Sequence, residues 1–128
     1  EQSLLDISDD IDLNRDRARY EADRTKDIEL TATHGIDAAI AEHELDALLF
    51  PMNRGANVSA RPGYPTVIVP MGLFTRETGP EFPESFVPQP APFGVSFAGL
   101  ACSEPRLIGL AYAFEQATLR RIPPPGTP

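Results

Sequence analysis

The sequence has no tryptophan, a single cysteine and no concentration of basic residues. Cys102 cannot form an internal disulfide, and a lone thiol without a neighbouring Cys or His is not a metal-binding pattern. The 128 residues contain 11 Lys and Arg against 19 Asp and Glu, which gives a net charge of -8. An acidic chain without a basic face argues against binding to nucleic acid. The lone thiol fits a reducing compartment and predicts a cytoplasmic protein.

Long hydrophobic runs are also missing. No apolar stretch approaches the roughly 20 residues that a membrane-spanning helix needs. With 41% apolar residues, the chain still has enough hydrophobic content for one domain. The composition therefore predicts a soluble protein that does not enter a membrane.

Two segments carry the spacing of amphipathic helices. Small and apolar residues recur at helical intervals over 16–44, and they stay in phase through Gly35, so the spacing predicts one long helix. Residues 103–121 predict a second helix, with Ser103 as its N-cap and Pro105 in its first turn. Residues 1–15 are acidic and weakly patterned, which indicates a docked arm or a short helical turn. Residues 122–128 form a tail.

Three short apolar runs, 46–50, 66–69 and 93–97, predict strands. The first two are apolar on both faces, which is typical of strands that helices cover on either side in a mainly parallel or mixed sheet. Two helices cannot cover both faces, so we expect the chain to sit inside a larger body. Residues 71–92 contain many prolines and predict a surface loop. Residues 51–65 predict a polar connection rich in small residues, in which one helical turn can form.

Acidic residues near the start of the chain offer one metal hypothesis. Asp10, Asp12, Asn14, Asp16 and Glu21 occupy positions one, three, five, seven and twelve of a calcium-binding loop. Position six, which needs Gly for its turn, is Arg15, and this places a cation where the metal would bind. We favour the structural interpretation, in which this acidic segment leads into the long helix and Asp12 or Asn14 caps it.

Five segments, taken together and in order, resemble the closing stretch of amidase signature enzymes. They are Gly35 to Pro51 (GIDAAIAEHELDALLFP), Pro62 to Gly72 (PGYPTVIVPMG), Pro92 to Gly99 (PFGVSFAG), Ser103 to Leu107 (SEPRL) and Ala111 to Ala117 (AYAFEQA). The resemblance covers most of residues 16–121. It implies an α/β fold in which residues 1–128 are the C-terminal segment of one amidase domain, with about three strands and two main helices belonging to a large mixed β-sheet flanked by helices.

The resemblance also implies amide hydrolysis by a serine nucleophile that a second serine and a lysine activate. In that family all three residues lie upstream of the matching region, and the two serines belong to a Gly- and Ser-rich signature. The only lysine here, Lys26, lies among the charges of the first predicted helix. We therefore expect no catalytic residue, no metal and no cofactor in this chain. The expected partners are the N-terminal remainder of the amidase domain, a small amide substrate and, as an open question, a second copy.

The segment after the first predicted strand is the place where a substrate would be met, because loops beyond strand ends build the pockets of α/β proteins. Asn53, Arg54 and Asn57 are its candidate substrate-binding residues. The rival function is a non-catalytic interaction or calcium-binding module that retains this part of the fold.

Overall fold

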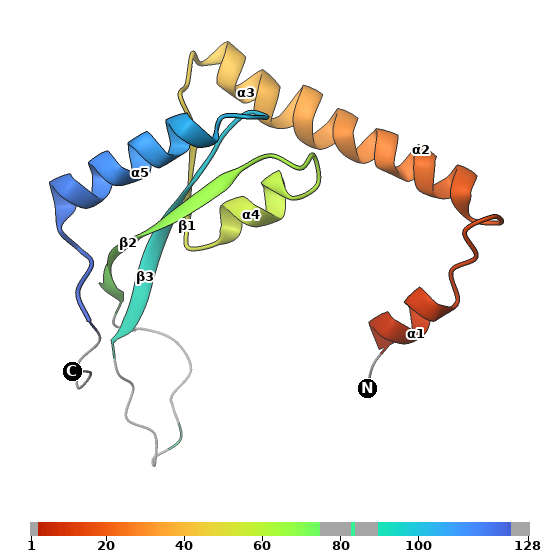
Figure 1. The fold of residues 1–128 in the computed structure, drawn as a ribbon, viewed down its shortest axis with the longest axis horizontal. Helices are drawn as coiled ribbons and strands as arrows, with labels where there is room; N and C mark the ends of the chain where they lie inside the picture. The colour runs from red at the N-terminus through yellow and green to blue at the C-terminus, as the bar shows by residue number, and fades with distance from the viewer. Residues whose placement is uncertain (1–2, 75–82, 84–89, 124–128) are drawn as a thin grey trace.

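The computed structural model describes residues 3–74, 83 and 90–123 (Figure 1). Its elements, in chain order, are α1 (Ser3–Asp9), α2 (Arg17–Ile28), the π-helix η1 (Glu29–Ile36), α3 (Asp37–Glu42), β1 (Leu48–Pro51), α4 (Arg54–Ser59), β2 (Thr66–Phe74), β3 (Ala91–Ala98) and α5 (Glu104–Thr118). Most of the predicted Pro-rich loop, and the end of the predicted tail, lie outside the described residues.

The three strands form one sheet in the order β1-β3-β2. Helices and sheet combine as the α/β prediction required, and that prediction is confirmed. Both outer strands run antiparallel to β3, so every pairing within the described residues is antiparallel. The apolar character of the strands predicted a mainly parallel or mixed sheet covered by helices, and in the described residues α5 and α4 pack on the two faces of the sheet.

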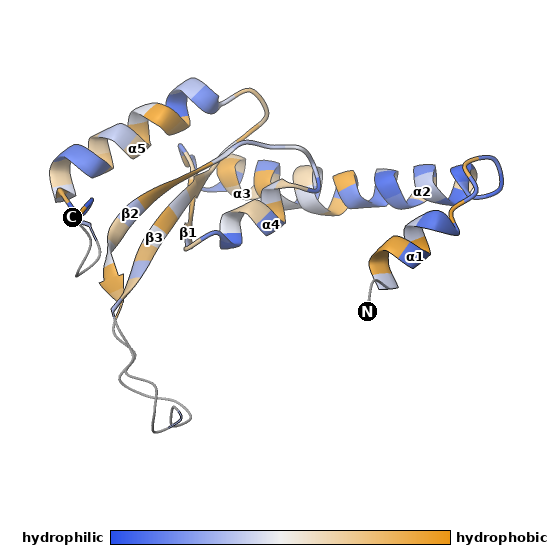
Figure 2. Cartoon of the chain, turned by 60° about the horizontal axis from the view of Figure 1, so that its bottom comes forward, coloured by the Kyte–Doolittle hydropathy of each residue, from blue (hydrophilic) through white to orange (hydrophobic). Residues whose placement is uncertain are grey.

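One face of the sheet packs against α5. Val69 of β2 and Val95 of β3 are paired and buried, and they meet Ala111 of α5 in the core. Next to them the rings of Phe97 and Phe114 meet edge to face, with centroids 5.9 Å apart. Figure 2 shows the contrast between the largely hydrophobic strands and the hydrophilic α2.

The opposite face of the sheet packs against α4. Side chains alternate between the two faces of a strand, so Phe50, Thr66 and Ser96 point away from α5. Gly55 of α4 lies against all three of these side chains. The short helix α4 is therefore fixed to the underside of β1 and β3.

The predicted long helix is a continuous helical rod from Arg17 to Glu42. Its middle, η1, is wound as a π-helix, in which the Asp37 N–H donates to the Ala32 carbonyl five residues earlier. Gly35 permits this winding, since a Cβ there would lie 2.9 Å from the Leu30 carbonyl oxygen. The rod ends two residues before the predicted end at 44, where Glu44 takes a positive φ of 51°.

The strand boundaries differ from the prediction. β1 begins and ends later than 46–50, while β2 extends to Phe74 and β3 begins at Ala91, so the loop prediction is wrong for 71–74 and 91–92. Pro70 had suggested a strand end. However, its ring nitrogen faces the outer edge of β2, because its partner Gly94 directs its own N–H and carbonyl toward Met52 beside β1. A proline there removes no bond of the ladder.

The two ends of the described chain also differ from the prediction. α1 is a seven-residue helix with no buried residue, and it stands clear of the sheet at the far end of α2 (Figure 1). At the other end α5 stops at Thr118, three residues before the predicted 121, because Leu119 adopts the left-handed conformation. Ser103 occupies the N-cap position, but its hydroxyl donates to the Leu100 carbonyl instead of capping the helix.

Candidate functional site

The turn from β1 into α4 places the candidate substrate-binding residues. Pro51 ends β1, and Met52 turns the chain with a left-handed φ of 54°. The Met52 N–H donates to the Gly94 carbonyl at 2.8 Å, and the Gly94 N–H donates back to the Met52 Sδ at 3.2 Å. This reciprocal pair fixes Asn53, the first residue after the turn, relative to the end of the sheet.

The three predicted residues lie on the exposed side of this turn and helix. Asn53 is the N-cap residue of α4, and Arg54 and Asn57 lie three residues apart, which makes them neighbours on one side of the helix. All three are exposed. The structure brings the three together on an exposed surface, and none of them lines the hollow beside the β1 turn described below. Their role in binding stays a prediction.

A polar layer under α4 was missed by the sequence analysis. Ser59 and Ser96 are 1% and 0% exposed, and Thr66 lies on the same face of the sheet. Within the described residues the hydroxyls of Ser59 and Thr66 have no hydrogen-bond partner, and the Ser96 hydroxyl makes one long bond to the Phe50 carbonyl. The signal was available in the small residues Gly55 and Ser59, whose four-residue spacing gives α4 a narrow inward side.

Tyr64 connects this layer to the long helical rod. Its hydroxyl donates to the Asp37 Oδ2 at 3.1 Å, and burial together with this bond raises the pKa of Tyr64. The other oxygen of Asp37 is buried without a partner among the described residues. Nearby, Arg61 forms an ion pair with Asp27 at 2.8 Å, which fixes the end of α4 to α2.

An open hollow of about 390 Å³ lies beside the β1 turn. Its lining residues come from the turn, both long strands and the segment after α5: Met52, Ile68, Val69, Pro70, Pro92, Phe93, Gly94 and Arg121. The lining is mainly apolar and has one cation, Arg121, which is paired with Glu115. It could hold an apolar group of a ligand or of a neighbouring protein segment.

No described residue forms an activated nucleophile. Ser96 is buried, and its hydroxyl faces a backbone carbonyl rather than a base. Cys102 is exposed in a left-handed turn, and no hydrogen bond from its thiol to a base is found in the described part of the chain. A serine or cysteine needs an activating base within hydrogen-bond reach to attack a carbonyl carbon, and no such bond to Ser96 or Cys102 is found among the described residues.

The calcium-loop hypothesis fails on geometry. The Asp12 carboxylate accepts bonds from the backbone N–H groups of Asn14 and Arg15, and the Arg15 guanidinium binds the Asp16 carboxylate at 2.7 Å. These contacts lower the pKa of Asp12, and they lower that of Asp16 to about 2. Arg15 thus occupies the centre of the would-be loop. The described residues hold no cluster of three or more His, Cys, Asp or Glu that could bind a metal.

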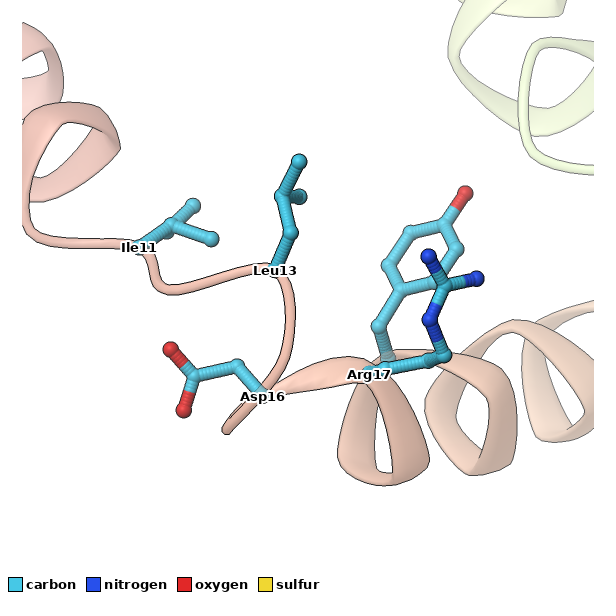
Figure 3. Close-up of a pocket in the computed structure, with 5 residues that line it drawn as sticks. Ile11, Leu13, Asp16 and Arg17 are labelled. Carbon is cyan, nitrogen blue, oxygen red and sulfur yellow. The ribbon is translucent and has the colours of Figure 1, made fainter.

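The same turn forms a feature that sequence analysis did not find. Ile11, Leu13 and Tyr20, together with Asp16 and Arg17, line a hollow of about 280 Å³ with a mainly apolar surface (Figure 3). In Figure 3 the side chains of Ile11 and Leu13 extend upward from the backbone, while the Asp16 carboxylate extends to the left of the view, away from Arg17. The irregular spacing of the apolar residues hid this grouping, because the turn at 12–16 interrupts any helical period.

Comparison with known proteins decides the family. The chain superposes on the X-ray structure of native peptide amidase from Stenotrophomonas maltophilia with a TM-score of 0.76 and 36% identity, over 96% of this chain. It is 42% identical over 91 residues to an Arabidopsis thaliana protein that bears the name of a probable amidase. This chain belongs to the amidase signature family. An Arthroderma benhamiae protein, also named as an amidase, is 37% identical over 98 residues.

This amidase family segment is short compared with its relatives. It spans 15% and 17% of the two curated proteins, which match 71% and 75% of it, and 25% of the Stenotrophomonas chain. A second peptide amidase structure, in complex with the competitive inhibitor chymostatin, matches 82% of the segment with a TM-score of 0.65 and 35% identity. No family model matches the sequence. Among the described helices, none is both long and apolar enough to cross a membrane.

Proposed function

We propose that this chain is the C-terminal structural and pocket-wall portion of an amidase that cleaves carboxamide C–N bonds. The observation that carries the proposal is the superposition on peptide amidase, which extends over 96% of the chain at 36% identity. The chain contributes three strands, the rod from α2 to α3 and the helix α5. The reactive serine, its serine partner and the lysine belong to the remainder of the domain, which is the principal partner of this segment.

The position of α4 supports a role in the substrate pocket. It follows the end of β1 directly and is fixed to the sheet through Gly55, so its exposed side is presented rigidly. Asn53, Arg54 and Asn57 offer amide and guanidinium groups that can donate hydrogen bonds to a substrate carbonyl. We assign these three residues to substrate binding and leave the chemistry of bond cleavage to residues outside the chain.

The substrate that we propose is a small carboxamide, and a peptide amide is the first compound to test because the structural relatives are peptide amidases. No organic cofactor or metal is needed for such a reaction when a base activates the serine and backbone donors hold the oxyanion. We also propose a cytoplasmic setting, which the single exposed thiol supports. A homo-oligomer is compatible with the exposed apolar surface but is not part of the proposal.

The test is the release of ammonia from a peptide amide by the intact polypeptide that carries these residues. We expect hydrolysis by the intact polypeptide and none by residues 1–128 alone. An intact polypeptide that hydrolyses no member of a panel of peptide amides and small carboxamides would refute the proposal. Nucleic acid is not expected to bind, and a gel-shift assay with the same preparation checks that point.

A further inference from the structure

We propose that residues 3–20 form a docking segment whose apolar side chains are covered by the part of the amidase body that lies outside this chain. The inference rests on the proposed function, since it takes the amidase body as the partner. It goes further by naming the surface that holds the two parts together. The occupant is an apolar surface of the same polypeptide, and a second copy of the chain is the competing outcome.

The docking segment exposes many large apolar side chains to solvent. Six large apolar side chains in these 18 residues are between 53% and 78% exposed: Leu4, Leu5, Ile7, Ile11, Leu13 and Tyr20. Single exposed apolar residues are normal on a protein surface, but four of these six, Ile7, Ile11, Leu13 and Tyr20, line two hollows that share Ile11 and Tyr20, and grouped apolar side chains mark an interaction site. The segment contains no buried residue, so nothing in the described part of the chain covers it.

The apolar side chains are held in place before any partner arrives. Between α1 and α2 the Asp12 backbone N–H donates to the Asp16 carboxylate at 2.9 Å, and the Asp12 carboxylate accepts bonds from the backbone N–H groups of the two residues before Asp16. Arg15 adds its bond to Asp16 and a further one to the Asp10 carbonyl. This turn fixes the walls of the hollow in Figure 3, and preorganisation of this kind lowers the entropic cost of docking.

The match with peptide amidase indicates which part of the protein packs on the docking segment. It includes 96% of this chain, so it leaves out only about five residues and must take in most of the docking segment. This chain accounts for 25% of the peptide amidase chain, and the other three quarters are available to pack against the segment. The same backbone path therefore exists inside a body four times as long, where one polypeptide can supply the apolar partner.

The test is hydrogen–deuterium exchange of the intact polypeptide, read on peptides from residues 3–20. A seven-residue helix such as α1 gives little protection by itself. We expect amides in this segment to exchange at least about tenfold more slowly than in a free peptide of the same sequence, independently of protein concentration. Exchange at the free-peptide rate would overturn the proposal. Protection that rises with concentration would also overturn it, since a second copy would then be the occupant.

Variants sharpen the same measurement. Leu13→Asp is expected to speed exchange in residues 3–20 by about tenfold and to leave the amides of β3 unchanged, while Leu13→Met keeps the segment protected. Leu119→Asp, at an equally exposed residue after α5, is the matched control and should not alter exchange in the segment. If Leu13→Asp leaves exchange unchanged, the proposal is wrong. Ammonia release is measured separately: a protected segment in an inactive polypeptide would sink the proposed function and leave the docking inference standing.

Discussion

Gly55 of α4 lies so close to Ser96 of β3 that a Cβ on Gly55 would stand 2.8 Å from the Ser96 Oγ. The same Cβ would stand 3.0 Å from the Phe50 ring. Real side chains essentially never pack so tightly, and the serine is fully buried and cannot swing away into solvent. The contact therefore sets the height of α4 above the sheet and, with it, the position of Arg54 and Asn57.

Replacement of Gly55 by Ala should force α4 away from the sheet. We expect the free energy of unfolding of the intact polypeptide to fall by about 1–3 kcal/mol, the usual cost of overpacking a tight contact. Gly109→Ala in α5 is the matched control, because a Cβ there meets nothing within 4 Å. It should stabilise by about 0.5–1 kcal/mol through helix propensity. Denaturant unfolding of both variants measures the difference, and equal effects would disprove the role of the Gly55 contact.

Arg54→Ala and Asn57→Ala should weaken substrate binding more than they slow the reaction. Loss of a hydrogen bond to a substrate carbonyl removes about 1–2 kcal/mol, so we expect KM for a peptide amide to rise about tenfold with kcat nearly unchanged. Lys26→Ala, at an exposed position of α2 outside the docking segment, should leave both constants unchanged. Steady-state kinetics of the intact enzyme decide the matter, and unchanged KM values in both variants would remove these residues from the site.

Leu119 ends α5 in a left-handed conformation with φ 51°, which costs a side chain about 1 kcal/mol relative to glycine. Leu119→Gly should therefore raise the free energy of unfolding by about that amount. Leu119→Ala keeps a Cβ and should bring no comparable gain. Thermal unfolding of the two variants gives the comparison. A Gly variant no more stable than the Ala variant would mean that another factor ends the helix.

The turn from Asp12 to Asp16 should lose stability when the solution becomes strongly acidic. The pKa of Asp16 is lowered from its usual 3.8 to about 2, first by its bond from Arg15 and then by the Asp12 N–H. A lowered pKa means that the stabilisation is fully present above pH 3.8 and is lost as the pH falls through about 2. Carbon-detected NMR titration should show this midpoint, and Arg15→Gln should move it back toward 3.8. An unchanged midpoint in that variant would contradict the assigned cause.

The isolated 128-residue chain should fold poorly. Among the described residues β1 and β2 are the two edge strands of the sheet, and Leu49 and Ile68 are 62% and 51% exposed on its opposite faces. The fraction of surface that a small domain buries is modest even with a complete core. We expect calorimetry to show no cooperative unfolding transition and the hydrophobic dye ANS to bind. A sharp transition from a well-behaved monomer would contradict this expectation.

The sequence predicted most of the elements that bury an apolar stripe. The β-branched run Thr66 to Val69 and the alternation around Phe97 are local signals, and they appear as strands where the residues predicted them. Strand boundaries that depend on the partner strand were harder to predict from the sequence. Pro70 looks like a breaker until the register shows that its nitrogen faces an open edge, and that register is a property of three strands together.

The candidate site shows the same division. Position in the chain was enough to place Asn53, Arg54 and Asn57 beyond the end of β1, and the structure puts them on one exposed turn and helix. The spacing of Gly55 and Ser59 indicated the narrow inward side of α4, but it did not indicate Thr66 as its neighbour, because that contact forms only when α4 folds back under the sheet. The calcium hypothesis failed for a reason already visible in the sequence, since Arg15 stands at the position that needs Gly.

Labelling with a fluorophosphonate probe, which reacts with activated serines, tests the central claim most directly. The intact polypeptide is treated with the probe, digested, and the modified serine is located by mass spectrometry. The account predicts a single modified serine in a peptide outside residues 1–128, and no modification of Ser59, Ser96 or Ser103. A label on any serine of this chain would contradict the claim that the segment builds the fold and the pocket wall while the reactive serine lies elsewhere.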